Sequence, residues 1–190
     1  MTPEQAEFCN THGLTEEQFF GKEEIKGDLK IGTLRSLTVI PADFKPVVEG
    51  DLSIVGYGKD VIIKERFSPK VGGDLFVFAE TIFDNFSPVV GKNCVMSSTI
   101  GGLKSIPKGF NPKVGFILDL RFVKNLPNGF CPDAYVVFLS RKTFKFLLPK
   151  NFKSEFEHDK DKSGRYRAYF EFISKSRTKP PGFKEIYGFD

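Results

Sequence analysis

Short runs in which apolar and polar residues alternate recur along the chain, and most of them are introduced by glycine. The runs are IKGDLKI (Ile25–Ile31), VEGDLSI (Val48–Ile54), VGGDLFVF (Val71–Phe78), VGKNCVM (Val90–Met96), VGFILDL (Val114–Leu120) and AYVVFLS (Ala134–Ser140). Alternation with a period of two residues is typical of a strand with one buried face. A glycine just before a strand allows a positive φ or a close approach of another backbone. Each run therefore predicts one short strand with a corner in front of it.

A second recurring unit places phenylalanine beside proline, as in PADFKP (Pro41–Pro46) and PKGFNP (Pro107–Pro112). The phenylalanines that anchor these units are Phe44, Phe67, Phe86, Phe110, Phe130, Phe152 and Phe183. Their spacings of 23, 19, 24, 20, 22 and 31 residues are typical of the coils of a solenoid. We expect each Phe to swing inward after a tight turn and to stack on the Phe of the neighbouring coil.

The segment between each strand and its phenylalanine carries single large apolar residues, such as Ile40 and Ile106, directly before proline. Proline imposes an extended conformation on the residue before it. We interpret this segment as a second corner, so that each coil contributes one strand.

The N-terminal residues, 1–24, predict a helical cap. Pro3 suits an early helical position, and Thr15 with Gln18 resembles a capping box. A solenoid needs such a cap because its first coil has no neighbour on one side.

The repeats occupy residues 25–153, and residues 154–190 predict a C-terminal capping strand with a basic tail. A charged loop over Ser154–Gly164 precedes the strand, in which Tyr166, Ala168, Phe170 and Phe172 alternate with polar residues. The sequence thus predicts one mainly β domain, a solenoid of about six to seven strand-and-turn coils of 19–24 residues.

These repeats resemble the leucine-rich-repeat-like proteins common in bacteriophage and prophage genomes, whose units read V-G-G-D-L-x-L and L-P-x-G-L. The best matches are Val71–Leu75, Ile106–Phe110 and Leu126–Phe130, and the resemblance covers roughly residues 25–153. Phe stands here where those repeats have Leu, and their ladder of asparagines is absent. The resemblance implies a right-handed solenoid, a strand-lined face for recognition and a phage-encoded protein, but no particular ligand.

Composition supports a folded protein in water. The chain is 40% hydrophobic and 27% charged, and its 22 Phe with no Trp agree with a phenylalanine column. Cys9, Cys94 and Cys131 show no CxxC spacing, so we expect reduced cysteines. With no run of eighteen apolar residues and no signal-peptide pattern, we expect the cytoplasm of a bacterial host, or a virion if the protein is structural.

A search for catalytic chemistry finds no candidate. The sequence has no GxSxG, P-loop or zinc-spaced motif, and His12 and His158 are far apart in sequence. We therefore expect a non-enzymatic protein with no catalytic residue, cofactor or metal site.

A row of aspartates near the predicted strand starts has two interpretations. Its members are Asp28, Asp51, Asp74 and Asp119, which recur near the predicted strand starts. Stacked carboxylates can bind calcium, whereas the alternative is that each Asp accepts hydrogen bonds from backbone amides at its corner. We favour the backbone role, because Asn93 interrupts the row.

The basic end of the chain is the candidate partner or nucleic-acid surface. Residues 141–190 hold thirteen Lys/Arg against seven Asp/Glu, a net charge of +6, which leaves −2 for residues 1–140. The candidate residues are Arg141, Lys142, Lys145, Arg165, Arg167, Lys175 and Arg177. In a strand, Arg165 and Arg167 face away from Tyr166 and Phe170, so a platform that stacks bases is disfavoured against a plain basic edge.

Three functions stay open on this sequence. The first is a protein-binding solenoid that engages or inhibits a host or phage protein, for example a component of host defence. The second is a virion or assembly protein that self-associates. The third is a nucleic-acid binder that uses the basic C-terminal third, for which binding should weaken strongly with salt.

Overall fold

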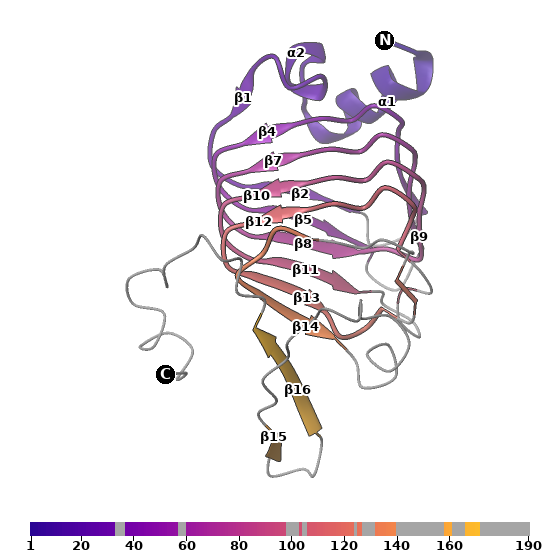
Figure 1. The fold of residues 1–190 in the computed structure, drawn as a ribbon. Helices are drawn as coiled ribbons and strands as arrows, with labels where there is room; N and C mark the ends of the chain where they lie inside the picture. Colours follow the sequence, from indigo (N-terminus) through magenta and orange to yellow (C-terminus); the bar gives the residue numbers. More distant parts are fainter. Residues whose placement is uncertain are drawn as a thin grey trace.

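The computed structural model describes residues 1–32, 37–56, 60–97, 103, 106–123, 125–126, 132–139, 158–160 and 166–171. These residues form a mainly β solenoid, in which the chain winds through stacked parallel strands (Figure 1). The predicted fold class is confirmed. Two helices, α1 (Pro3–His12) and α2 (Glu16–Phe19), lie over the N-terminal end.

Three sheets run along the solenoid. Sheet A contains β1 (Glu24–Ile25), β4 (Val47–Val48), β7 (Lys70–Val71), β10 (Val89–Val90) and β12 (Lys113–Val114). The solenoid part of sheet B contains β2 (Leu29–Ile31), β5 (Leu52–Val55), β8 (Leu75–Phe78), β11 (Cys94–Ser97), β13 (Ile117–Leu120) and β14 (Val136–Leu139). Sheet C contains β3 (Thr38–Ile40), β6 (Val61–Ile63) and β9 (Thr81–Ile82).

Pairing is parallel along all three of these stacks, with equivalent positions of the repeat side by side. Leu29 pairs with Leu52, and Leu52 pairs with Leu75. Since β1 and β12 are the first and fifth strands of sheet A, the chain completes four turns between them. The last coils of the predicted set, anchored by Phe152 and Phe183, lie outside the described residues.

The sequence predicted one strand per coil, and this part of the prediction was wrong. The alternating runs form sheet B as expected, but sheets A and C are additional. Their strands are only two or three residues long, which is too short for alternation to be recognised in sequence. The second corner is therefore replaced, in the first three coils, by a strand of sheet C.

The predicted C-terminal strand is present as β16 (Tyr166–Glu171), which pairs antiparallel with β14. The charged segment before it was predicted to be a loop. It contains β15 (His158–Lys160), which pairs antiparallel with β16. Among the described residues, no helix combines the length and the apolar character that crossing a membrane requires.

The phenylalanine column is confirmed for four coils. Phe44, Phe67, Phe86 and Phe110 are at most 1% exposed. Successive ring centroids lie 5.8, 5.3 and 5.3 Å apart, and all three pairs are stacked. Phe130 lies outside the described residues. Because each ring covers its neighbours, no coil could bury its own Phe alone.

The helical cap extends this column by one step that the sequence did not reveal. Phe19 is fully buried, and its ring centroid lies 5.1 Å from that of Phe44. The Phe19 carbonyl accepts a hydrogen bond from the Lys45 amide, as the Phe44 carbonyl does from Ser68 one coil later. The end of α2 thus supplies the phenylalanine of an incomplete first coil.

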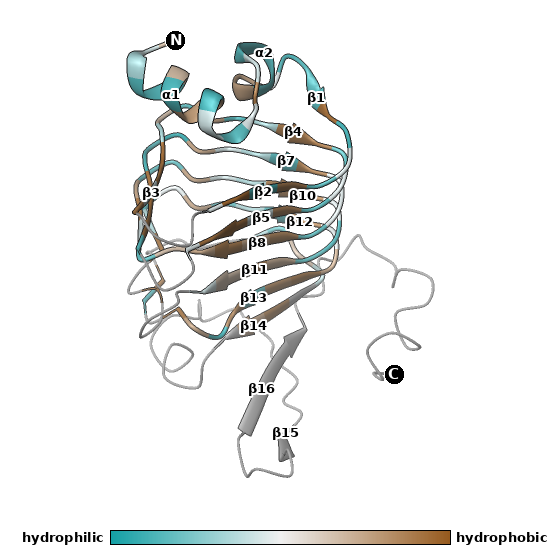
Figure 2. Ribbon diagram, turned by 180° about the vertical axis from the view of Figure 1, so that it is seen from behind, coloured by the Kyte–Doolittle hydropathy of each residue, from teal (hydrophilic) through white to brown (hydrophobic). Residues whose placement is uncertain are grey.

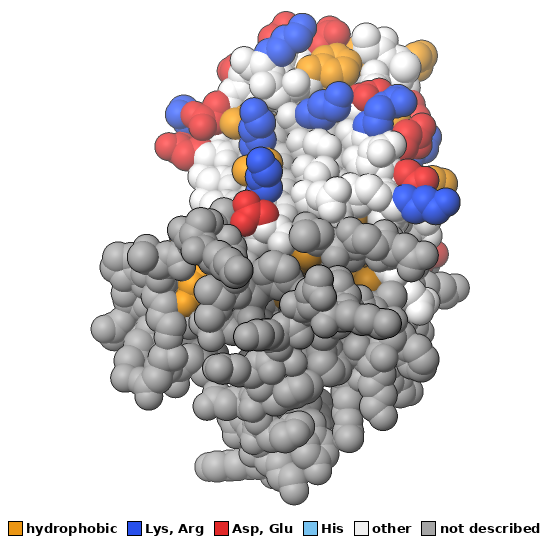
Figure 3. Space-filling view, in the orientation of Figure 1, with side chains coloured by type: hydrophobic (Ala, Val, Ile, Leu, Met, Phe, Trp, Pro, Cys, Tyr) orange, Lys and Arg blue, Asp and Glu red, His pale blue; other side chains and the backbone are white. Residues whose placement is uncertain are grey.

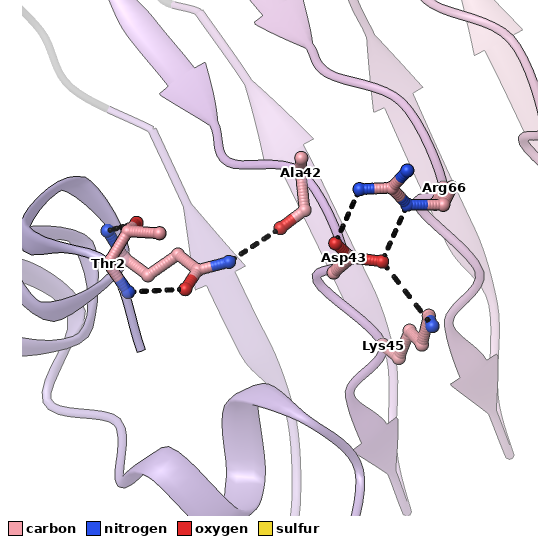
Figure 4. A network of polar contacts seen from close by, with 6 residues as sticks. Thr2, Ala42, Asp43, Lys45 and Arg66 are labelled. Atoms are coloured by element: carbon pink, nitrogen blue, oxygen red, sulfur yellow. Dashed lines mark hydrogen bonds and ion pairs between the residues drawn. The ribbon is translucent and has the colours of Figure 1, made fainter.

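The residue before each column Phe has a positive φ. The angles are 63° at Asp43, 61° at Arg66, 63° at Asn85 and 75° at Gly109. Glycine, asparagine and aspartate tolerate this left-handed conformation, whereas arginine adopts it rarely. At Arg66 the guanidinium donates two hydrogen bonds of 2.7 Å to Asp43 in the preceding coil (Figure 4), which offsets part of that cost.

The helix α1 is tied to the solenoid by side chains as well as by packing. The predicted helical character of this end is confirmed, and capping boxes are present at both Thr2 with Gln5 and Thr15 with Gln18. Gln5 also donates from Nε2 to the Ala42 carbonyl at 3.1 Å, a bond that Figure 4 places between α1 and the first turn.

Candidate functional site

The acidic row at the strand starts is a ladder of hydrogen bonds to the backbone. The Asp28 carboxylate accepts from the Asp51 amide at 2.9 Å, and the Asp51 carboxylate accepts from the Asp74 amide at 2.7 Å. Asp74 accepts in turn from both nitrogens of Asn93, and the Asn93 side chain continues the ladder to the amide of Ile117. The favoured backbone role is confirmed, and each rung joins one coil to the next.

Asp119 was wrongly placed in this row. It lies in β13, where its register partners are Val95 and Phe138, not the residues of the ladder. It is 5% exposed, and its carboxylate accepts a 2.6 Å hydrogen bond from the guanidinium of Arg121. The sequence misled because Asp119 lies in a glycine-led run, as the others do, but two residues after the ladder position, which Ile117 occupies in this coil.

Glycine at this corner allows the coils to approach, as the sequence predicted. A Cβ at Gly91 would lie 2.2 Å from the carbonyl oxygen of Gly72, and one at Gly115 would lie 1.9 Å from that of Gly91. Gly27, which lies in the first coil and one position later in the repeat, has a φ of 73° with open space around it. Glycine is thus used at Gly91 and Gly115 for close backbone contact and at Gly27 for a positive φ.

The described histidines and cysteines belong to no group that could hold a metal. Within the described residues, no group of three or more His, Cys, Asp and Glu could hold one. Burial raises the pKa of the thiols of Cys9 and Cys94, so both are protonated and poorly nucleophilic at neutral pH. His158 lies in β15. Cys131 lies outside the described residues.

The predicted basic surface is described at one position only. Arg141, Lys142, Lys145, Arg165, Lys175 and Arg177 lie outside the described residues. Arg167 lies in β16, opposite Asp159 of β15. Over the N-terminal coils, charged side chains of both signs are interspersed (Figure 3), so this described part of the face carries no field of one sign.

The outer face of sheet B is a candidate surface that the sequence analysis did not single out. Register aligns six outward positions, namely Lys30, Ser53, Phe76, Val95, Asp119 and Phe138. The row is polar at the N-terminal end and becomes aromatic and aliphatic in β8 and β11. Figure 2 shows hydrophobic residues along β5, β8 and β13, which include the inward core residues of these strands such as Leu52 and Leu75.

A second outward row strengthens this apolar character. Val55 pairs with Phe78, and both are half-buried, as are Phe76, Val95 and Phe138. Two Phe at outward positions of one strand, where the preceding coil has Ser53 and Val55, were the sequence signal that could have revealed the surface.

Arginine and aromatic rings meet at the far end of this face. The guanidinium carbon of Arg121 lies 5.4 Å from the ring centroid of Phe138 and 6.0 Å from that of Phe122, which is 53% exposed. Such distances suit cation–π contacts. We define the outer surface of sheet B as Phe76, Phe78, Val95, Arg121 and Phe138.

A separate cavity lies between the cap and sheet C. Its volume is about 350 Å³, and it is lined by Glu4, Glu7, Phe8, Thr11, His12, Leu37, Thr38, Val39 and Pro41. The residues from α1 share one helical face, because they are three or four positions apart. The other wall is β3 with its flanking residues.

His12 in the cavity wall is partly removed from water and packs against an aromatic ring. The His12 ring packs on Phe8 with a centroid distance of 4.6 Å, and burial lowers the pKa of His12 below its usual value. The imidazole is therefore neutral at pH 7, and it adds no positive charge to the cavity.

Comparison with known proteins gives no relative from which a function could be transferred. The chain matches no family model, no curated protein and no solved structure.

Proposed function

We propose that this protein is a non-enzymatic, protein-binding solenoid that contacts its partner through the outer surface of sheet B. The observation that carries the proposal is the row of half-buried Phe76, Phe78 and Val95 on a face whose earlier positions are Lys30 and Ser53. Aromatic residues and arginine are enriched in protein interfaces, and aliphatic residues beside them exclude water. This surface contains all three kinds.

The stacked coils support such a role physically. Parallel pairing fixes the spacing of outward side chains at about 4.8 Å per coil. A rigid face loses little conformational entropy on binding, so more of the contact energy appears as affinity. An interface of ordinary size needs about 800 Å² per partner, which an extended solenoid face can provide.

The repeat resemblance is the basis for a narrower proposal about the partner. It favours a phage-encoded protein that engages or inhibits a host or phage protein in the bacterial cytoplasm, with a host-defence component as one form. The basic residues from Arg141 to Arg177 would then supply a second contact or steer association.

The proposal is tested by comparing two surface variants in a pull-down from bacterial lysate with mass spectrometry. Phe76→Ser copies the residue that the preceding coil has at this position, and should abolish capture of a stoichiometric partner. Val89→Ser, at a 43% exposed position of sheet A, is the matched control and should leave capture unchanged. Equal capture by both variants would contradict the proposal.

The same samples separate the two alternatives. A defined homo-oligomer in light scattering that Phe76→Ser dissolves would indicate a self-assembling structural protein. Capture of nucleic acid that is lost as the salt concentration rises from about 50 to about 200 mM would indicate a phosphate-binding surface.

A further inference from the structure

The cavity between α1 and β3 is a different feature from the outer surface of sheet B, and its walls carry unequal charge. Lys64 pairs with Glu4, with its Nζ 2.7 and 2.8 Å from the two carboxylate oxygens. Glu7, on the same face of α1, forms no ion pair with any described residue. With His12 neutral, no described cation balances the Glu7 carboxylate in the cavity.

A second polar group in the cavity wall lacks a partner. Thr38 is 4% exposed, and its Oγ1 is buried without a hydrogen bond. Its register partner in the next coil is Val61, so a hydroxyl is not required by the fold at this position. A buried hydroxyl without a partner is uncommon and costs stability.

The remaining walls are apolar, and they continue onto sheet C. Leu37, 52% exposed, and Val39 border the cavity, and Val39 lies beside Ile62 on the outer side of the sheet. One coil further, Phe83 is 48% exposed. A ligand with an alkyl chain could therefore bury that chain while its charged end reaches Glu7.

We propose that this cavity binds a lysine side chain of a partner protein, with the ammonium paired to Glu7 and the alkyl chain against Leu37 and Val39. Lys64 already makes a contact of this kind, since its ammonium is paired with the lining residue Glu4. The volume of about 350 Å³ is at the lower end of ligand pockets, and it suits one long side chain. The partner rests on the proposed function, whereas the cavity can be tested without it.

The test is an NMR titration of the full chain with Nα-acetyl-lysine amide, and with Nα-acetyl-norleucine amide as the uncharged control. The lysine derivative should shift the amides of Thr11, His12, Thr38 and Val39, with a dissociation constant on the order of 1–10 mM, because one ion pair supplies little free energy. The norleucine derivative should bind at least about fivefold more weakly.

Two variants with opposite expected effects on affinity test where the ammonium binds. Glu7→Gln should weaken binding by about fivefold, and Lys64→Gln should strengthen it, because Glu4 is then released. Glu17→Gln, an exposed position on α2, is the matched control and should change nothing. Thr38→Val should raise the melting temperature, because it removes the buried hydroxyl that has no partner.

Binding of both derivatives with equal affinity, or no shift at these amides up to 50 mM, about five times the weakest expected constant, would overturn the proposal. A positive titration with no partner in the pull-down would leave the cavity assignment standing and reject the proposed function alone. If the titration failed but a partner was captured through Phe76, the cavity assignment would be rejected and the proposed function would stand.

Discussion

Two corners of the coil, one at glycine and one at phenylalanine, hold the solenoid together in different ways. At the glycine corner, backbones of successive coils touch, as where Gly91 leaves room for the carbonyl of Gly72. At the phenylalanine corner, a residue with positive φ aims a ring such as Phe86 at its neighbours. The first corner depends on the absence of a side chain, and the second depends on the presence of one.

This difference teaches where the repeat tolerates variation. Space at the glycine corner is limited by main chain, which cannot be repacked, whereas ring packing can adjust by small movements of side chains. Accordingly, the φ-positive position varies among Asp43, Arg66, Asn85 and Gly109. The close-contact position is glycine in three successive coils, as Gly72, Gly91 and Gly115, after Lys26 and Glu49 in the first two. Substitutions should therefore cost more at the first corner than at the second.

The largest effect is expected for Gly91→Ala. The added Cβ would lie 2.2 Å from the carbonyl oxygen of Gly72 and 3.0 Å from its carbonyl carbon, so two coils must separate. We expect a loss of more than about 4 kcal/mol in unfolding free energy, measured by urea denaturation. Gly27→Ala, where only the φ of 73° opposes the methyl group, should cost about 1–2 kcal/mol. Equal losses would show that backbone contact does not limit this corner.

Phe86→Ala is expected to rank second, at about 3–5 kcal/mol, because it leaves a cavity in the middle of the column. Phe83→Ala, three residues away and 48% exposed, removes the same ring from the surface and should change stability far less. The two melting temperatures measure the difference. If they coincided, stacking would not be what stabilises the phenylalanine corner.

The aspartate ladder should contribute less than the ring. Asp51→Ala leaves the Asp74 amide without its 2.7 Å acceptor, and we expect a loss of about 1–2 kcal/mol. Asp51→Asn keeps an oxygen in place, as Asn93 does naturally, and should retain most of the stability. Thermal unfolding with calcium and with EDTA should give the same midpoint, and a rise with calcium would revive the cation-binding interpretation.

The smallest effect is expected at the ion pair between Arg66 and Asp43. Hydrogen bonds from the guanidinium hold the pKa of Asp43 below its usual value, so the charged carboxylate favours folding. This contribution is present at neutral pH and is lost as the pH falls through the lowered pKa of Asp43. Asp43→Asn should therefore lower the free energy of unfolding slightly at pH 7, by less than about 1 kcal/mol, and make no difference in acid, so that the acid limb of the stability curve, measured by urea denaturation, becomes flatter.

The interior of the solenoid could be predicted from sequence because inward positions repeat with a fixed period. Leu29, Leu52 and Leu75 align in the structure as the alternation indicated, and the Phe units gave the column. Sheets A and C could not be predicted, since two-residue strands such as β4 carry no period. Their formation depends on neighbouring coils, not on local sequence.

The exterior was harder to predict, for a different physical reason. Outward positions are free to vary, so nothing in the repeat marks Phe76 as part of a surface until the register aligns it with Val95. Likewise, the cavity at Thr38 arises from contact between α1 and β3, which are distant in sequence. The basic residues from Arg141 onward remain a prediction, apart from the position of Arg167 in β16.

The cap at Phe19 has a consequence for how many molecules the fold can join. A solenoid has translational symmetry, so the bare end of one copy is complementary to the opposite end of another, and growth in one dimension has no natural limit. Residues 1–20 close that end. Phe19, at the end of α2, supplies the ring and the carbonyl of a first coil, and the helices α1 and α2 lie over it. They prevent the end-to-end polymerisation that the repeats alone would permit.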